Sequence, residues 1–469
     1  METKDNPLLS CLPLLKTRIS FINAISKAPL FNTFNSIQDR LIESEKIISE
    51  FFVGLPRHYY FYERVVNKMI ESYRIRTPEV MIRKLAEGNT FSHQETIDLL
   101  SDQIRTAPSI FGTYLIGLAG TGKTTIVNNI IKLFPKAIPQ PKLGVTQIPI
   151  VRIQTPYRAS RKDLCKSFFR ELDNLAKTNY SEQFIRHNET DLADQVRRKT
   201  LSHMIGTIVL DEIQDLKTSK TGPTEMTLAF IKQLTNVVGV PIVFIGSLES
   251  AGILFGNFQL ASRSQGFKWE RFEKDDTYDY FIKSLFKCRV IDGDQELDKT
   301  IADLYYELTQ GIPRLLNLLH VEAQKICLHS KKNRIEPRDL VIASKNLFTS
   351  TSLAMSGIKN YNAEILSRYP DLLTIENFKK NMVTRGEDSG KSSDSYSEGK
   401  EHTAPGTNGS SRKRIKNKPD DSKVPLTNEI YRMQGDLLEL TQNCKTSNEV
   451  YRIFSEQHII PDISEVVEF

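Results

Sequence analysis

The segment from Gly117 to Thr125 has the residue types and the spacing of a loop that binds the phosphate groups of a nucleotide. It reads GLAGTGKTT and fits the pattern of a glycine, four residues, and Gly-Lys-Ser/Thr. Glycines let backbone N–H groups close around phosphates, Lys123 neutralises the β- and γ-oxygens, and the Thr124 hydroxyl is a ligand for Mg²⁺. The predicted ATP contacts are Gly117, Gly120, Thr121, Gly122, Lys123, Thr124 and Thr125. A strand-like run before the loop and a helix-like run after it make an incidental glycine-rich turn a remote alternative.

A pair of carboxylates supplies what a bound ATP needs for hydrolysis. In TIVLDEIQDL (207–216), Asp211 ends an apolar strand and can hold Mg²⁺ through water. The adjacent Glu212 can orient and polarise the attacking water. Strand ends often carry acids, so the pair alone says little. Following a phosphate loop, it predicts phosphoryl transfer to water.

A polar residue also ends the run VPIVFIGS, at Ser247. Its hydroxyl could contact the γ-phosphate or hold the attacking water. It could equally be the N-cap of a helix formed by LESAGILF. The sequence leaves both interpretations open.

The elements that must position these residues are short apolar runs alternating with helical stretches. The runs are TYLIGL (113–118), IPIVRI (148–153), GTIVLD (206–211) and VPIVFIG (240–246). Continuous apolar runs are typical of parallel strands covered by helices on both faces. We therefore expect an α/β nucleotide-binding core.

Composition divides the chain into five predicted regions. Residues 51–73 predict a turn and an amphipathic helix, more consistent with an arm packed on the core than with a binding site of its own. The segment 385–423 is rich in Gly, Ser, Pro and charge, which is typical of disorder. The predicted regions are an N-terminal helical or extended arm (1–105), the α/β core (106–270), a helical lid with an extension (271–382), a disordered linker (383–425) and a partner-binding tail (426–469).

Bulk composition excludes some classes of protein. The 469 residues are 39% hydrophobic and 26% charged, and no apolar run approaches the length of a membrane span. Five scattered cysteines without a C-x-x-C pair suggest buried thiols rather than a zinc site or disulfides. The N-terminus lacks the layout of a secretory signal, so a cytoplasmic location is expected. A net charge of +6 permits a nucleic-acid partner without requiring one.

The order of these features resembles the AAA+ ATPase family. A phosphate loop, an Asp-Glu strand end and a polar strand end precede a helical region containing GIPRLLNLL (311–319). The resemblance implies a three-layer core with a parallel sheet and a small helical lid, from which Arg314 reaches back to the nucleotide. It also implies an arginine finger within QLASRSQGFKWERF (259–272), with Arg263 as first choice and Arg271 as second.

Further stretches are similar to the TnsC and TniB type of ATP-dependent regulators of bacterial DNA transposition. They are FFVGLPRHYYFYERVVNKM, LDEIQDL, the Ala-Ser-Arg stretch and TPYRASRKDLCKSFFRELDNLAKTNY (155–180). This resemblance implies a bacterial protein that oligomerises on double-stranded DNA as a ring or filament, with ATP between subunits. It further implies transposase and target-selector partners, and disassembly on hydrolysis.

The residues expected to contact DNA phosphates are Arg158, Arg161 and Lys162, just after the second strand. A second basic cluster (197–199) is better explained as a solvated helix face. Two other functions remain open: a loader or motor ATPase acting on a helicase or secretion complex, and a scaffold that uses ATP as structural glue. The first predicts no stimulation of strand transfer, and Glu212 argues against the second.

Overall fold

The computed structural model places the regions that carry the predicted core, lid and N-terminal arm. The described residues are 6–13, 15–32, 35–106, 112–157, 159–218, 231, 239–250, 264–360 and 362–369. The predicted linker (383–425) and tail (426–469) lie outside them. Among the described residues, no helix combines the length and the apolar character needed to cross a membrane.

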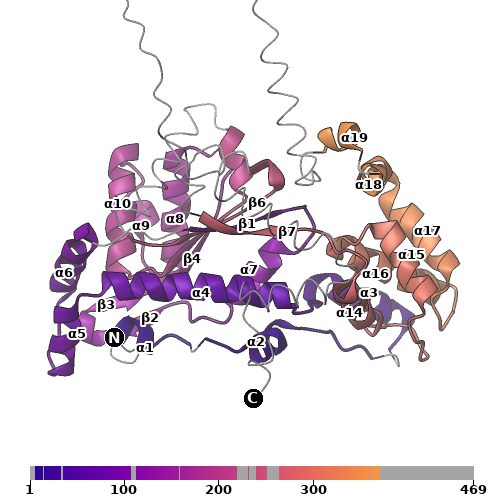
Figure 1. The fold of residues 1–469 in the computed structure, drawn as a ribbon, viewed down its shortest axis with the longest axis horizontal. Coiled ribbons are helices and arrows are strands. Elements are labelled where there is room, and N and C mark those ends of the chain that lie inside the picture. The colour runs from indigo at the N-terminus through magenta and orange to yellow at the C-terminus, as the bar shows by residue number, and fades with distance from the viewer. Residues whose placement is uncertain are drawn as a thin grey trace, which may run out of the picture. The chain divides into compact units, whose positions relative to one another are not determined.

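The centre of the fold is a five-stranded sheet in which every pair of neighbouring strands is parallel (Figure 1). The strands, in their order across the sheet, are β4 (Ile150–Gln154), β5 (Thr207–Asp211), β6 (Ile242–Gly246), β1 (Gly112–Gly117) and β7 (Ser264–Trp269). The predicted α/β core with a parallel sheet is confirmed. Because the strands are parallel, the residues after β1, β5 and β6 meet at one edge of the sheet.

Helices cover both faces of the sheet, and this explains the continuous apolar runs. Alternate residues of one strand divide between two cores: Ile208 and Leu210 pack with the helices of one face, and Val209 packs with those of the other. The first face is covered by α8 (Arg161–Ala176) and α10 (Glu189–Ser202). The second face is covered by α4 (Pro56–Arg76) and α7 (Lys123–Ile131).

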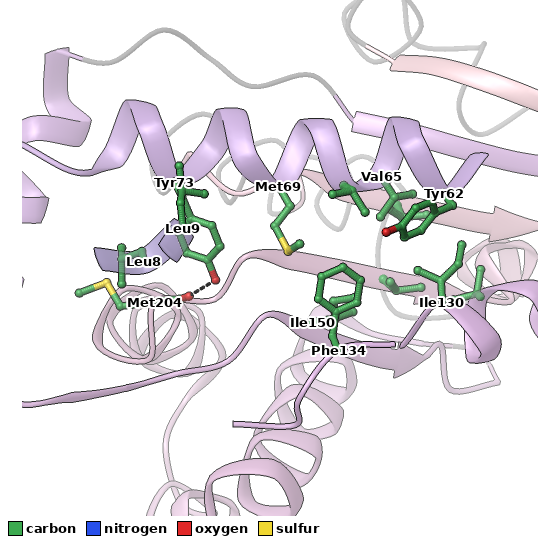
Figure 2. Close-up of a cluster of buried hydrophobic side chains, with 14 of the residues drawn as sticks. Leu8, Leu9, Tyr62, Val65, Met69, Tyr73, Ile130, Phe134, Ile150 and Met204 are labelled. Atoms are coloured by element: carbon green, nitrogen blue, oxygen red, sulfur yellow. Dashed lines mark hydrogen bonds between the residues drawn. The ribbon is translucent and has the colours of Figure 1, made fainter. Parts of the chain in front are cut away.

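Helix α4 is the longest element of the N-terminal region, and other residues of that region, such as Leu8, Phe21 and Leu100, share its hydrophobic core with the sheet. Pro56 stands at its first turn, where a missing N–H costs nothing, and Val65 and Met69 are buried against the sheet. The Tyr73 hydroxyl donates to the carbonyl of Met204 at 2.8 Å, which ties the far end of α4 to the segment before β5 (Figure 2). The N-terminal region therefore forms part of the three-layer core.

The edge strand β7 was not anticipated from the sequence. Its last four residues alternate in exposure, with Trp269 buried and Gly266 and Lys268 exposed, so the strand lacks a continuous apolar run. Gly266 lies beside Tyr114 of β1, and a Cβ there would come within 1.9 Å of the Tyr114 ring. Gly266 is therefore required for this ring to lie across the edge strand.

Most of the lid consists of helices that follow β7 in the chain. Its helices are α14 (Asp276–Phe286), α15 (Lys299–Thr309), α16 (Pro313–His329), α17 (Pro337–Phe348), α18 (Ser352–Lys359) and α19 (Ala363–Ser367). The remaining elements are α1 (Pro7–Ser10), α2 (Arg18–Ile25), α3 (Ile37–Glu50), α5 (Glu79–Ala86), α6 (His93–Thr106), α9 (Tyr180–Gln183) and the hairpin β2 (Ile138–Gln140)–β3 (Val145–Gln147).

Helix α3 belongs to the hydrophobic core of the lid, although it precedes the sheet in the chain (Figure 1). Ile47 is buried among lid residues, and Lys325 of α16 forms an ion pair with Glu45. The buried Arg40 donates from Nε to the carbonyl of Val290 at 2.6 Å. The lid is thus assembled from two segments on either side of the core sequence.

Candidate nucleotide-binding site

The phosphate loop connects the end of β1 to the start of α7. Gly120 and Gly122 have φ angles of 77° and 91°, a region that L side chains rarely adopt. Gly122 is the N-cap of α7, so the first backbone N–H groups of this helix point out of the loop. Gly117 lies against β7, where a Cβ would come within 1.8 Å of the Trp269 carbonyl oxygen. Each of these glycines is therefore needed for the backbone path.

The side chains of the loop are held by the loop itself. Lys123 donates from Nζ to the carbonyl oxygens of Gly117 at 2.9 Å and Leu118 at 2.6 Å. The Thr121 hydroxyl donates to the Leu118 carbonyl at 2.7 Å, and Trp269 Nε1 donates to the Thr121 carbonyl at 3.1 Å. The ammonium group thus lies at the centre of the loop curve, beside the N-terminus of α7.

The lid contacts the loop directly through the start of α16. The backbone N–H of Arg314 donates to the Gly120 carbonyl at 3.1 Å. A Cβ on Gly120 would lie 3.1 Å from Ile312 Cγ2 and 3.3 Å from Arg314 Cβ. Arg314 has an exposed side chain and lines the same cavity as Lys123. The structure therefore brings the predicted lid arginine to the phosphate loop.

Asp211 lies at the end of β5 and is 1% exposed. Its Oδ2 accepts from Arg152 Nη2 of β4 at 2.6 Å, and its Oδ1 accepts from the N–H of Glu212 at 3.0 Å. Arg152 was not singled out in the sequence, because a single arginine inside an apolar run carries no motif. Arg152 pairs with Val209 in the sheet, and this pairing of β4 with β5 brings it near Asp211.

Glu212 has a φ of 56°, which is unusual for a residue with a Cβ. Its Oε2 accepts a hydrogen bond from Gln214 Nε2, and Gln214 Oε1 accepts from the backbone N–H of Ser247 at 3.1 Å. Ser247 is 5% exposed, and its Oγ has no hydrogen-bond partner among the described residues. Among the described residues, the hydroxyl therefore caps no backbone N–H.

These residues line one cavity of about 1080 Å³, a volume sufficient for a nucleotide. From the core and lid it is lined by Lys123, Thr124, Thr125, Asp211, Glu212, Gln214, Ser247 and Arg314. The glycine-lined loop, the Asp211 oxygens and the buried Ser247 hydroxyl, which has no partner among the described residues, fit ATP with Mg²⁺. Asp211 retains acceptor capacity beyond its two hydrogen bonds, because a carboxylate has about four lone-pair sites.

Sequence reasoning missed the opposite wall of the cavity, which the N-terminal region supplies. Residues 51–53, Leu55 and His58 line it, together with Ser26 and Lys27. The His58 ring stacks on Phe52 and Trp269, and burial holds the pKa of His58 well below its usual value. The aromatic and apolar character of this wall suits a nucleobase. The signal was present as the run FFVGLP directly before α4.

Arg57 lies at the junction of this wall, β7 and the lid. Its guanidinium is 4.8 Å from the Trp269 ring centroid and 4.9 Å from that of Phe272, and Nη1 donates to the Glu270 carbonyl at 3.1 Å. Burial lowers the pKa of Arg57 to about 10. The group remains cationic at neutral pH, stacked between two aromatic rings.

The two arginine-finger candidates differ in what can be said of them. Arg263, the first choice, lies outside the described residues. Arg271 donates from Nη1 to the carbonyl oxygen of Gln310 at 3.0 Å and to its Oε1 at 3.2 Å. These bonds anchor Arg271 to the lid of its own chain and weaken its case as a residue that enters a neighbour's site.

The three residues predicted to contact DNA differ in what the structure describes of them. Arg158 lies outside the described residues. Arg161 donates from Nε to Glu189 at 2.5 Å, so most of its charge is compensated within the chain. Lys162 stands in the first turn of α8 and is half-buried. In the second basic cluster (197–199), Arg197 and Arg198 both form ion pairs with Asp194. Such pairs are typical of a solvated helix face.

Comparison with known proteins identifies the segment that carries the site. A family model described as an AAA domain matches residues 112–254. No curated protein matches the sequence.

Several solved structures are similar to the chain. The Aeropyrum pernix ORC1 protein in complex with DNA shares 16% identity, with 78% of this chain and 83% of that chain covered and a TM-score of 0.37. A Walker-type ATPase of Pyrococcus abyssi shares 15% identity over 60% and 77% of the two chains, with a TM-score of 0.36. The Thermotoga maritima RuvB branch migration motor shares 15% over 59% and 74%, with a TM-score of 0.32. The segment 112–254, which matches the AAA domain model, contains the phosphate loop, the two carboxylates and Ser247.

Proposed function

We propose that this protein is a Mg²⁺-dependent ATPase that oligomerises on double-stranded DNA when ATP is bound and regulates transposition. The observation that carries the ATPase proposal is the convergence of Lys123, Thr124, Asp211, Glu212 and Arg314 on one cavity. They come from the core and the lid, and each has a chemical role in phosphoryl transfer to water.

The roles follow from the groups themselves. Lys123 and Arg314 would neutralise phosphate oxygens, and backbone N–H groups at the start of α7 would donate to them. Thr124 and Asp211 would hold Mg²⁺, which supplies further positive charge to the phosphates. The Glu212 carboxylate would orient the attacking water and polarise it. Catalysis on this account is positioning and electrostatic stabilisation without a covalent intermediate.

The DNA and transposition parts of the proposal are supported by the stretches that resemble transposition regulators. One of them, 51–69, supplies both the cavity wall and the start of α4. Another, 155–180, contains Lys162 and follows β4, whose Arg152 pairs with Asp211. A nucleic-acid contact beside this strand would therefore be one strand away from the ATP site. Transposase and target-selector proteins are the proposed partners, and hydrolysis would dissolve the assembly.

The test uses Glu212→Gln, which is nearly isosteric and leaves the phosphate and Mg²⁺ ligands in place. Binding of labelled ATP should stay within a few-fold of the parent, and phosphate release should fall by roughly two orders of magnitude or more. In a reconstituted reaction the variant should remain on DNA longer and lose control over where insertion occurs. Asp215→Asn is the matched control, because it removes a carboxylate from the same segment outside the cavity lining.

Two results would contradict different parts of the proposal. Phosphate release at the parental rate would remove Glu212 from the hydrolytic step. Rapid release from DNA with ATP still bound would contradict the proposal that hydrolysis dissolves the assembly, and it would leave the ATPase assignment intact. A motor or loader would instead stall and lose its downstream activity.

A further inference from the structure

The Gln214 side chain forms hydrogen bonds to two residues of the site, Glu212 and Ser247. Its Nε2 donates to Glu212 Oε2, and its Oε1 accepts from the Ser247 backbone N–H at 3.1 Å. Glu212 follows β5 and Ser247 follows β6, so a single side chain connects the ends of two adjacent strands. Gln214 also lines the cavity with both of them.

The two partners determine the orientation of the Gln214 amide, with Nε2 toward Glu212 and Oε1 toward Ser247. A backbone N–H can only donate, and an ionised carboxylate can only accept. Glutamine offers one donor group and one acceptor at the required separation. A glutamate at position 214 would face the carboxylate with a second acceptor, and a methionine would leave both partners without a hydrogen bond.

The local backbone is arranged around this bridge. A Cβ on Gly246 would lie 2.9 Å from Gln214 Oε1 and 2.8 Å from Ile213 Cγ1, so a larger residue would disturb the segment that carries Gln214. Glu212 keeps a φ of 56°, a conformation that persists when surrounding contacts hold it. The Gln214 hydrogen bond is one of those contacts.

The turn that Gln214 holds carries a candidate phosphate contact, the Ser247 hydroxyl. It is buried, lines the cavity and has no hydrogen-bond partner among the described residues. A buried hydroxyl of this kind costs free energy unless a ligand satisfies it. The oxygen of a terminal phosphate is the acceptor that the proposed substrate would provide.

We propose that Gln214 is a positioning residue that holds the Glu212 carboxylate at a fixed place relative to the Ser247 turn. The inference rests on the proposed ATPase function and adds a coupling between phosphate contact and water activation. Gln214 takes one of the roughly four lone-pair sites of the Glu212 carboxylate, so acceptor sites remain for water. A shift of the β6 end would move the carboxylate with it.

The experiment compares Gln214→Glu, Gln214→Met and the parent full-length chain. Labelled-ATP binding should remain within about threefold of the parent, because no phosphate or Mg²⁺ ligand changes, and hydrolysis should fall by about tenfold or more. The matched control is Gln183→Glu, which adds the same charge at an exposed position of α9.

Hydrogen–deuterium exchange provides a readout that does not depend on hydrolysis. The peptide spanning 240–250 should exchange faster at Ser247 in Gln214→Met, because its N–H loses the acceptor. Unchanged exchange together with parental hydrolysis in both variants would overturn the proposal. If the parent itself released no phosphate, the proposed ATPase function would fail, and the exchange result would still decide whether Gln214 holds the two strand ends together.

Discussion

The Asp211 carboxylate is a buried negative charge, and Arg152 is its ion-pair partner. The side chain of Asp211 is 2% exposed and that of Arg152 is 28% exposed. Removing one member of a buried pair leaves the other charge uncompensated, which costs about 3–5 kcal/mol when both are fully buried. In this site Mg²⁺ would supply a second positive charge to the same carboxylate. Arg152 therefore has its largest effect on stability when no Mg-nucleotide is bound.

Arg152→Met should accordingly lower the melting temperature more in EDTA than in the presence of Mg²⁺ and a nonhydrolysable ATP analogue. We expect a loss of roughly 2 kcal/mol or more without Mg²⁺, reduced by the partial exposure of Arg152. Differential scanning fluorimetry under both conditions measures the difference. Arg161→Met is the control, since neither Arg161 nor its partner Glu189 lines the cavity, and its effect should be equal in both conditions. An equal loss in both for Arg152→Met would contradict the argument.

At the scale of elements, α16 joins the lid core to the phosphate loop through its first turn and contains a buried histidine farther along. His320 is 0% exposed; one ring nitrogen contacts the Tyr305 hydroxyl at 2.8 Å, and the other contacts the Cys288 carbonyl at 3.0 Å. A carbonyl only accepts, so Nε2 carries the proton and Nδ1 accepts from Tyr305. Burial lowers the pKa of His320 to about 4.

The sign of the pH effect follows from this shift. The folded pKa lies below the unfolded value of about 6.5, so the unfolded chain binds the proton more readily. The stability contributed by neutral His320 is present above pH 6.5 and is lost as pH falls from 6.5 toward 4. His320→Gln, which keeps one donor and one acceptor, should flatten the decline in urea-unfolding free energy between pH 7 and 5. The same slope in parent and variant would show that other groups govern acid sensitivity.

Elements with a regular apolar pattern could be predicted from the sequence, and elements defined by their partners could not. The four runs that became β1, β4, β5 and β6 are apolar on both faces because helices cover both faces. Strand β7 lies at the sheet edge and alternates, so its sequence resembles a loop. Helix α3 is amphipathic, but the sequence of residues 37–50 does not indicate which element its apolar side packs on. In the structure that element is the lid, which lies far downstream in the chain.

The site shows the same division. A phosphate loop has a fixed spacing within one segment, so its residues could be assigned directly from the sequence. Arg152 and Gln214 act through strand pairing and a bridge between strand ends, and the cavity wall at 51–55 is brought to the loop by the path of α4. These contacts depend on tertiary structure, and the sequence around each residue contains no motif that predicts them.

At the scale of the whole molecule, a net charge of +6 permits binding to a polyanion, and the location of the charge determines how. Because Arg161 is paired with Glu189, we expect Lys162 and Arg158 to contribute more to DNA binding than Arg161. Arg158→Glu with Lys162→Glu should weaken binding to unrelated duplexes about equally and flatten the salt dependence by roughly one unit of slope per lost phosphate contact.

The measurement is fluorescence anisotropy with two duplexes of different sequence at several salt concentrations. Arg197→Glu is the control, since that arginine is already paired on a solvated helix face. A loss of affinity for one sequence alone would identify base-reading residues. An unchanged salt slope would place the phosphate contacts elsewhere.

The membership of α3 in the lid has a consequence for synthesis of the protein. Ile47 and Phe51 emerge from the ribosome early, but their partners in α16 follow only after the whole sheet has been made. At about 5–20 residues per second, this interval lasts roughly 15 to 60 seconds. The parallel sheet and its covering helices can therefore fold while the first segment of the lid still exposes its apolar side. Any nascent or truncated chain that ends before α16 should be a substrate for chaperones, even when its nucleotide-binding core is already complete.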